Sequence, residues 1–112
     1  MKLITAVIQR NKLDAVTDAL AEKGVGGLTV TDVMGYGSQK GRKEVFRGQT
    51  YEANFLSKTR IDVIVDGEIV EEIIDTIVEA ARTGSIGDGK VWATQLTGVV
   101  RVRTGEHGKD AI

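Results

Sequence analysis

The sequence contains no cysteine and no proline, and only one histidine among 112 residues. Without cysteine there is no disulfide, thiolate nucleophile or thiolate metal site, which fits a reducing compartment. One histidine cannot form a histidine-based zinc site within a single chain. That residue, His107, stands beside Glu106 with no serine or cysteine nucleophile pattern near it. No arrangement for nucleophilic or acid–base catalysis is therefore predicted.

Long apolar runs and an excess of one charge are also missing. No run approaches the roughly 20 residues that span a bilayer, and residues 1–10 (MKLITAVIQR) lack a signal-peptide pattern. The net charge of −1, from 15 basic and 16 acidic residues, argues against a nucleic-acid surface. Hydrophobic residues make up 41% and charged residues 28%. These numbers predict one soluble domain over residues 1–112, in the cytoplasm.

Hydrophobic periodicity predicts five strands and two helices. Gly24 is expected to end the first helix in the left-handed region, and Asp66 to cap the second. The predicted strands cover 3–8, 28–34, 59–65, 91–96 and 99–102, and the predicted helices cover 13–20 and 69–81.

Between Gly35 and Ser57 the sequence shows no sustained period of 2 or 3.6. The segment is rich in glycine and charge, and it holds four of the five aromatic residues, Tyr36, Phe46, Tyr51 and Phe55. A long irregular segment in a small domain usually has a function, so this one is expected to bind something or to be modified.

The order strand, helix, strand, long loop, strand, helix, strand predicts an α+β fold, the ferredoxin-like βαββαβ sandwich. Both helices would cover one face of an antiparallel sheet. The other face would be bare and mostly apolar, and such a face usually packs against a partner chain.

The segment from Thr83 to Lys90 is the first candidate site. Glycines at 84, 87 and 89 let the backbone approach a ligand, and Lys90 adds a positive charge that suits phosphate oxygens. The spacing matches neither the Walker A motif nor the dinucleotide fingerprint. The alternative is an ordinary glycine-rich connection.

Two further sets of polar residues suggest anion and metal binding. Arg101 and Arg103 would point to the same side of a strand and suit a polyphosphate, although solvated surface arginines are the more common case. In the long segment, Gln39 has an oxygen that can bind Mg²⁺, and Lys40 and Lys58 can pair with carboxylates. The alternative there is a plain polar loop.

Four stretches together resemble the PII nitrogen-regulatory signal proteins, and the resemblance covers essentially the whole chain. They are residues 35–41 (GYGSQKG), 44–51 (EVFRGQTY), 81–90 (ARTGSIGDGK) and 100–106 (VRVRTGE). The resemblance implies a homotrimer with nucleotide clefts between neighbouring subunits, where ATP and ADP compete. It divides the chain into a T-loop over about 37–57, a glycine-rich B-loop over about 82–90 and a C-terminal loop over about 101–112.

The resemblance also assigns roles to individual residues. The adenine would lie among Val7, Thr29, Gly35, Tyr36 and Val63 or Ile64, and the phosphates among Gly37, Gln39, Gly87, Asp88, Gly89, Lys90, Arg101 and Arg103. Gln39 would bind Mg²⁺ on ATP, and 2-oxoglutarate would bind through that metal with Gln39, Lys40, Gly41, Lys58 and Gly87. Tyr51 matches a nucleotidylation site of some members, and Arg47 a tip residue that enters an ammonium transporter.

The implied function is a sensor of nitrogen, carbon and energy status, not an enzyme. Its T-loop would regulate an ammonium transporter or nitrogen-metabolism enzymes and regulators, and membrane contact would come only through a transporter. Ser38 stands where arginine is common, and Gln9 and Arg10 replace a usual Lys-Pro. The alternative is a slow ATPase on the same fold, with Asp88 as the one carboxylate of the glycine segment. A nucleic-acid binder is rejected, because only Trp92 among the aromatics lies on a predicted strand.

Overall fold

The computed structural model describes the backbone of residues 1–37, 43–46, 49–52 and 55–112, and the side chains of 1–37 and 55–112. The strands are β1 (Lys2–Ile8), β2 (Thr29–Tyr36), β3 (Lys43–Phe46), β4 (Gln49–Glu52), β5 (Phe55–Val65) and β6 (Gly89–Gln95). The α-helices are α1 (Leu13–Glu22) and α2 (Val70–Ala81), and short 3₁₀ turns cover η1 (Arg10–Lys12), η2 (Gly67–Ile69) and η3 (Gly108–Ala111).

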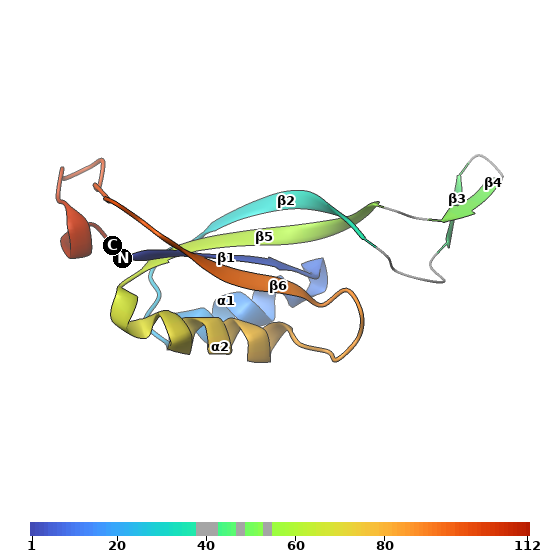
Figure 1. Ribbon diagram of the computed structural model, residues 1–112, viewed down its shortest axis with the longest axis horizontal. Helices are drawn as coiled ribbons and strands as arrows, with labels where there is room; N and C mark the ends of the chain where they lie inside the picture. Colours follow the sequence, from blue (N-terminus) through green and yellow to red (C-terminus); the bar gives the residue numbers. More distant parts are fainter. Residues whose placement is uncertain (38–42, 47–48, 53–54) are drawn as a thin grey trace.

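Four strands form one antiparallel sheet in the order β2-β5-β1-β6. Both helices lie on the same face of this sheet, and the β3–β4 hairpin stands at the far end of β2 and β5 (Figure 1). The two β-α-β halves interleave, because β5 lies between β2 and β1. This arrangement confirms the predicted α+β class and agrees with the ferredoxin-like order.

The core lies between the helices and one face of the sheet. In β5 every second residue from Thr59 onward is buried, and in β1 the buried apolar residues Ile4, Ala6 and Ile8 alternate, while Thr5 is buried on the other face. The buried residues of the helices recur at the predicted helical spacing. The core residues are Ile4, Ala6, Ile8, Val16, Leu20, Ile61, Val63, Val65, Ile73, Ile77 and Ala81. The helix ends also follow the prediction: Gly24 has φ +85°, and the Asp66 carboxylate accepts a hydrogen bond from the Glu68 N–H at 3.3 Å.

The segment from Gly35 to Ser57 is more regular than the sequence predicted. Strand β2 continues to Tyr36, which pairs with Phe55 at the start of β5, and β3 pairs with β4 in between. Tyr36 and Phe55 therefore belong to the sheet and not to a loop. Periodicity missed this pairing because strands are held by neighbours distant in sequence.

The predicted fifth strand over 99–102 is wrong. After β6 the described chain has one isolated bridge, between Val100 and His107. The chain turns back at Gly105, which has φ +73° and donates its N–H to the Arg101 carbonyl oxygen at 2.8 Å. Arg101 and Arg103 thus lie in and beside a turn, so the expectation that a strand aligns them also fails.

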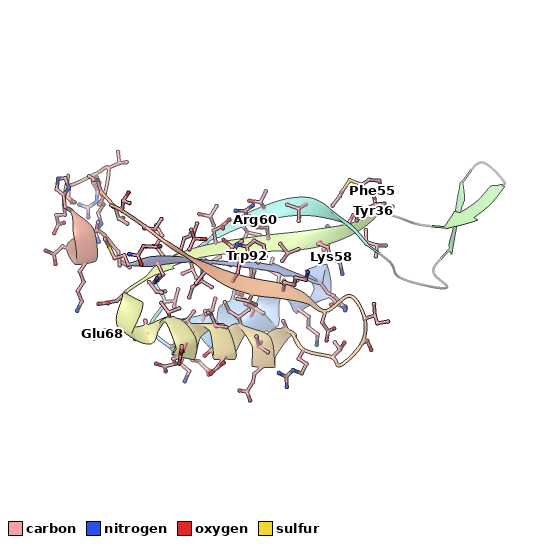
Figure 2. The ribbon with its side chains drawn as sticks, viewed as in Figure 1. Tyr36, Phe55, Lys58, Arg60, Glu68 and Trp92 are labelled. Atoms are coloured by element: carbon pink, nitrogen blue, oxygen red, sulfur yellow. The ribbon has the colours of Figure 1, made fainter. Side chains whose placement is uncertain are left out.

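The sheet face opposite the helices is mixed, not mostly apolar as predicted. An ion pair between Arg60 and Asp62 at 3.0 Å lies on it, and the Thr5 hydroxyl donates to Asp62 at 2.7 Å. Trp92 lies on the same face, 43% exposed and opposite Thr5 (Figure 2). Among the described residues, no helix has the length and apolar character needed to cross a membrane.

Candidate functional site

The predicted glycine loop joins α2 to β6, and its glycines adopt conformations that other residues avoid. Gly84, Gly87 and Gly89 have φ values of +87°, +99° and +106°. Gly89 also lies against β1, where an added Cβ would come within 1.8 Å of the Val7 carbonyl oxygen. Gly89 is therefore required by the packing of the strand, whatever the loop binds.

The Asp88 carboxylate is the centre of this loop. It accepts hydrogen bonds from the Thr83 and Gly84 N–H groups, both at 2.8 Å, from the Thr83 hydroxyl, and from Gln9 Nε2 at 3.2 Å. The bonds from Thr83 and Gly84 hold the pKa of Asp88 below its ordinary value. A carboxylate so engaged is a poor base for activating water, which argues against the slow-ATPase alternative.

Several other predicted residues gather at this end of the sheet. Lys58 Nζ donates to the Gly87 carbonyl oxygen at 2.6 Å, and the Lys58 stem crosses Gly35, where an added Cβ would lie 3.4 Å from Cγ. Lys90 pairs in register with Val7 on the neighbouring strand. The rings of Tyr36 and Phe55 lie 5.1 Å apart beside them (Figure 2).

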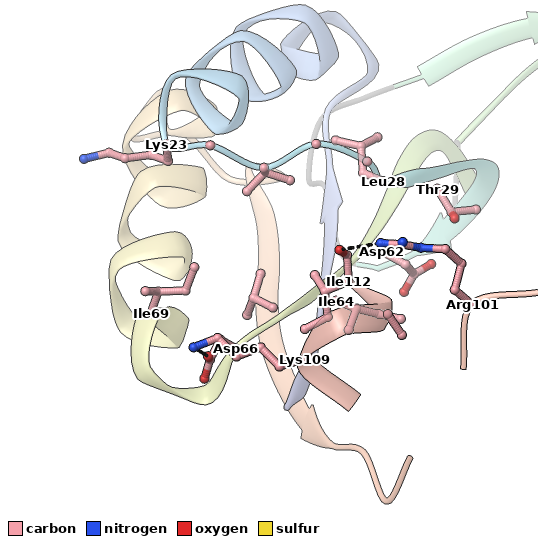
Figure 3. A pocket seen from close by; sticks show the side chains of 16 residues that line it. Lys23, Leu28, Thr29, Asp62, Ile64, Asp66, Ile69, Arg101, Lys109 and Ile112 are labelled. Atoms are coloured by element: carbon pink, nitrogen blue, oxygen red, sulfur yellow. Dashed lines mark hydrogen bonds and ion pairs between the residues drawn. The ribbon is translucent and has the colours of Figure 1, made fainter. Parts of the chain in front are cut away.

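A cavity of about 750 Å³ lies at the opposite end of the sheet (Figure 3). It is lined by three predicted nucleotide residues, Thr29, Ile64 and Arg101, together with apolar and polar neighbours. Arg101 is oriented by Glu106, at 3.1 Å, and by the Ile112 carbonyl oxygen, at 3.2 Å. This size and mixed lining fit a small planar ligand with polar substituents.

An ion pair fastens the C-terminal segment across this cavity. Lys109 Nζ lies 3.1 Å from the Asp66 carboxylate, and both residues line the cavity. The Glu68 N–H and Lys109 hold the pKa of Asp66 below its ordinary value, while Asp66 raises the pKa of Lys109. The last residues of the chain therefore close one side of the cavity.

The chain does not bring all the predicted nucleotide residues together. Gly89 pairs with Ile8 at one end of β1, whereas Gln95 pairs with Lys2 at the other, and the C-terminal segment continues from there (Figure 1). Seven strand residues span about 20 Å. The glycine loop and Lys90 are thus separated from Arg101 by roughly the length of the sheet.

Some predicted residues lie outside the described parts of the chain. Gln39, Lys40 and Gly41 fall among residues 38–42, and Arg47 falls within 47–48. Tyr51 is placed only by its backbone in β4. Gly37 follows β2 and is exposed, and Arg103 is exposed within the turn at 102–104.

Sequence reasoning assigned no role to three residues that shape these two places. Gln9 and Thr83 bind Asp88, and Asp62 lines the cavity beside Thr29. A threonine five residues before an aspartate, with glycine between, is a local signal for a side chain that binds a turn backbone. No local signal marks Gln9, which is 79 positions from its partner.

The comparisons with known proteins agree with this architecture. The family model described as "Nitrogen regulatory protein P-II" matches residues 1–106. The chain is 50% identical over its full length to the Nitrogen regulatory protein P-II of Azospirillum brasilense, covering 100% of both chains. It is 49% identical to the Nitrogen regulatory protein P-II 1 of Methanothermobacter thermautotrophicus, covering 97% of that protein. It is 48% identical to the protein of the same name in Escherichia coli K12, covering 100% of it. The chain belongs to the P-II nitrogen regulatory protein family.

Proposed function

We propose that this chain is a sensor of nitrogen, carbon and energy status that acts as a homotrimer and not as an enzyme. ATP and ADP compete for a cleft between neighbouring subunits, and 2-oxoglutarate joins when Mg²⁺–ATP is bound. The T-loop then reports the bound state to a partner, either an ammonium transporter or an enzyme or regulator of nitrogen metabolism. The protein works in the cytoplasm and reaches a membrane only through such a transporter.

The observation that carries the proposal is the separation of two half-sites on one chain. One end of the sheet offers Lys90 and a glycine backbone rich in N–H groups, and the other offers a cavity with Arg101. Each half suits part of a nucleotide: the first suits phosphates, and the second suits a base and ribose with one guanidinium toward the phosphates. Contact between opposite ends of two copies completes the site.

A ring of copies satisfies this contact for every chain. An interface between two different ends of a molecule is heterologous. Copies joined in this way form a closed ring only when the rotation from each copy to the next brings the last copy into contact with the first. Three copies give three equivalent clefts. The mixed open face of the sheet, with Trp92 and the Thr5–Asp62–Arg60 group, supplies the remaining contact area.

Positive side chains near the glycine loop support the 2-oxoglutarate assignment. Lys58 lies within reach of Gly87, and a hollow of about 300 Å³ beside it is lined by Lys58 and Arg10 together with one acidic residue, Asp32. A dicarboxylate needs such cations, and a metal held by ATP and Gln39 supplies the rest of the positive charge. Arg47 and Tyr51 are the proposed partner contact and modification site of the T-loop.

A mixed-subunit experiment tests the shared cleft directly. Lys90→Ala and Arg101→Ala homo-oligomers are each expected to bind ADP about tenfold more weakly than the unaltered protein, because each loses a charge-assisted hydrogen bond. Co-expressed, the two variants should recover about a quarter of the full-affinity sites by random mixing. Calorimetry with ADP and ATP counts those sites.

The expected recovery depends on the two residues coming from different chains. The control is a double variant that carries Lys90→Ala and Arg101→Ala on one chain. When it is co-expressed with unaltered chains, the oligomers contain the same proportion of Lys90 and Arg101 as in the mixture of single variants. No recovery in the mixed oligomer, or unchanged affinity in the single variants, would remove the assignment.

A further inference from the structure

The Asp88 side chain stands inside a loop that the proposed function gives to phosphate, although it carries a negative charge. Its carboxylate lies between the Thr83 and Gly84 N–H groups at 2.8 Å each. A free carboxylate in that place would repel phosphate. Hydrogen bonds from backbone N–H groups and the Thr83 hydroxyl stabilise the charge within the loop.

Asp88 also connects the loop to the neighbouring strand. Gln9 follows the last residue of β1, and its amide nitrogen donates to Asp88 at 3.2 Å. The same end of β1 contacts Gly89, whose missing Cβ leaves room for the Val7 carbonyl oxygen. Thr83 and Gly84 before Gly87, and Gly89 after Asp88, therefore have these contacts in the ligand-free chain.

The bonds to Asp88 define which backbone groups remain for a ligand. The N–H groups of Thr83 and Gly84 are taken by the carboxylate, and the Ser85 N–H is taken by the Thr83 hydroxyl at 3.2 Å. The N–H groups of Gly87 and Gly89 donate to neither Asp88 nor Thr83 within the described residues. Both glycines have positive φ values, which suit a backbone that turns its N–H groups toward an anion.

We propose that Asp88 is a positioning residue, which holds the first half of the glycine loop closed so that the second half is preformed for phosphate, and which makes no contact with phosphate itself. Gln9 and Thr83 hold the Asp88 carboxylate in this position, and the three residues together are called the brace below. The proposal rests on the proposed function, since it deepens the account of the same nucleotide site.

The test compares Asp88→Asn with Asp75→Asn. Both substitutions remove one negative charge, but the Asp75 side chain is exposed on α2 and makes no hydrogen bond or ion pair within the described residues. An asparagine at 88 turns an N–H₂ group toward two of the four donors and leaves a single oxygen as the acceptor. We expect amide hydrogen exchange over residues 83–86 of the ligand-free protein to rise about tenfold in Asp88→Asn.

Affinity for ADP should fall by a similar factor in Asp88→Asn, while the thermal midpoint of the ligand-free protein stays close to that of Asp75→Asn. A Thr83→Ser variant, which keeps the hydroxyl, should behave like the unaltered protein, and Thr83→Ala should follow Asp88→Asn in part. This rescue by serine separates a specific brace from a general loss of structure.

Two results are decisive against the brace. Unchanged exchange over 83–86 in Asp88→Asn overturns it, and weaker ADP binding in that case would mean that the carboxylate acts on the ligand directly. Faster exchange with unchanged ADP affinity also overturns it, because the loop would need no preforming. Absence of nucleotide binding by the unaltered protein would instead refute the proposed function, and the exchange measurement made without ligand keeps that failure distinct.

Discussion

The Lys58 ammonium group donates a hydrogen bond to the Gly87 carbonyl oxygen over 2.6 Å. This bond joins the beginning of β5, which follows the β3–β4 hairpin, to the glycine loop that follows α2 (Figure 2). A carboxylate ligand that binds Lys58 must share or replace this bond. The proposed binding of an acidic effector would therefore be linked to the shape of the glycine loop through one side chain.

Replacing Lys58 by methionine keeps most of the stem that packs over Gly35 but removes the charge. We expect 2-oxoglutarate affinity in the presence of Mg²⁺–ATP to fall at least about tenfold, because a charge-assisted hydrogen bond is lost. Calorimetric titration of 2-oxoglutarate measures the change. With ADP in place of ATP, the unaltered protein should give no binding heat.

Lys2→Met is the matched control for this prediction. Lys2 pairs with Val65 and Gln95 at the end of the sheet away from Lys58 and lines neither hollow, so its loss should leave 2-oxoglutarate binding unchanged. Equal 2-oxoglutarate affinity in Lys58→Met and the unaltered protein would show that Lys58 does not hold the effector. Equal binding with ADP and ATP would show that the metal on ATP does not hold it.

Gly89→Ala is expected to destabilise the fold whether or not nucleotide binds. Its Cβ would lie 1.8 Å from the Val7 carbonyl oxygen, at a backbone φ of +106°. The resulting strain and strand displacement should cost on the order of 2 to 4 kcal/mol in the free energy of unfolding. Urea denaturation measures it. Gly98→Ala, where an added Cβ meets nothing within 4 Å, should change stability by less than about 1 kcal/mol.

The Asp62 carboxylate should make stability depend on acid pH. Burial raises the pKa of Asp62, but hydrogen bonds from Arg60 and Thr5 and the Arg60 charge outweigh burial and leave the pKa below its ordinary value. Because the folded state then binds the proton less tightly than the unfolded state, the stabilisation is present above about pH 4 and is lost as the pH falls through the folded value.

Asp62→Asn should therefore lower stability at pH 7 by about 1 kcal/mol, since partial exposure screens the ion pair. It should also flatten the fall in thermal midpoint between pH 5 and pH 3 that the unaltered protein is expected to show. Thermal unfolding across that range, with Asp75→Asn as control, checks both effects. A slope as steep in Asp62→Asn as in the control would contradict the assignment.

The fold could be predicted from the sequence where a residue pattern reflects its own local burial. The alternation in β5 and the helical stripe of α2 come from apolar side chains that face one core, so periodicity located them. Residues 99–102 carry three valines, yet no neighbouring strand pairs with them beyond the one bridge at Val100. Pairing depends on distant residues and on turns such as Gly105, and periodicity contains neither.

The same limit applies to the candidate site. The glycines, Lys90 and Arg101 could be selected by type, because their chemistry is visible in a single residue. The contacts that organise them join positions 29 and 79 apart, Lys58 with Gly87 and Gln9 with Asp88. These contacts depend on the register of β1 against β5 and β6, which no local pattern encodes.

Assembly through the open face of the sheet is the final prediction, and Trp92 reports it. This one tryptophan lies on β6 on the face away from the helices and is 43% exposed in the single chain. Light scattering should give a mass three times that of the 12.0 kDa chain, and Trp92 emission should shift to longer wavelength when dilution or denaturant separates the subunits.

Trp92→Asp should prevent assembly, because it places an unpaired charge in a buried contact. Val30→Asp is the control, since Val30 is 44% exposed on β2 but on the helix side of the sheet, and it should leave the oligomer intact. A single-chain mass for the unaltered protein, or a stable oligomer in Trp92→Asp, would mean that the open face is not the surface through which the copies meet, and the shared nucleotide cleft would lose its physical basis.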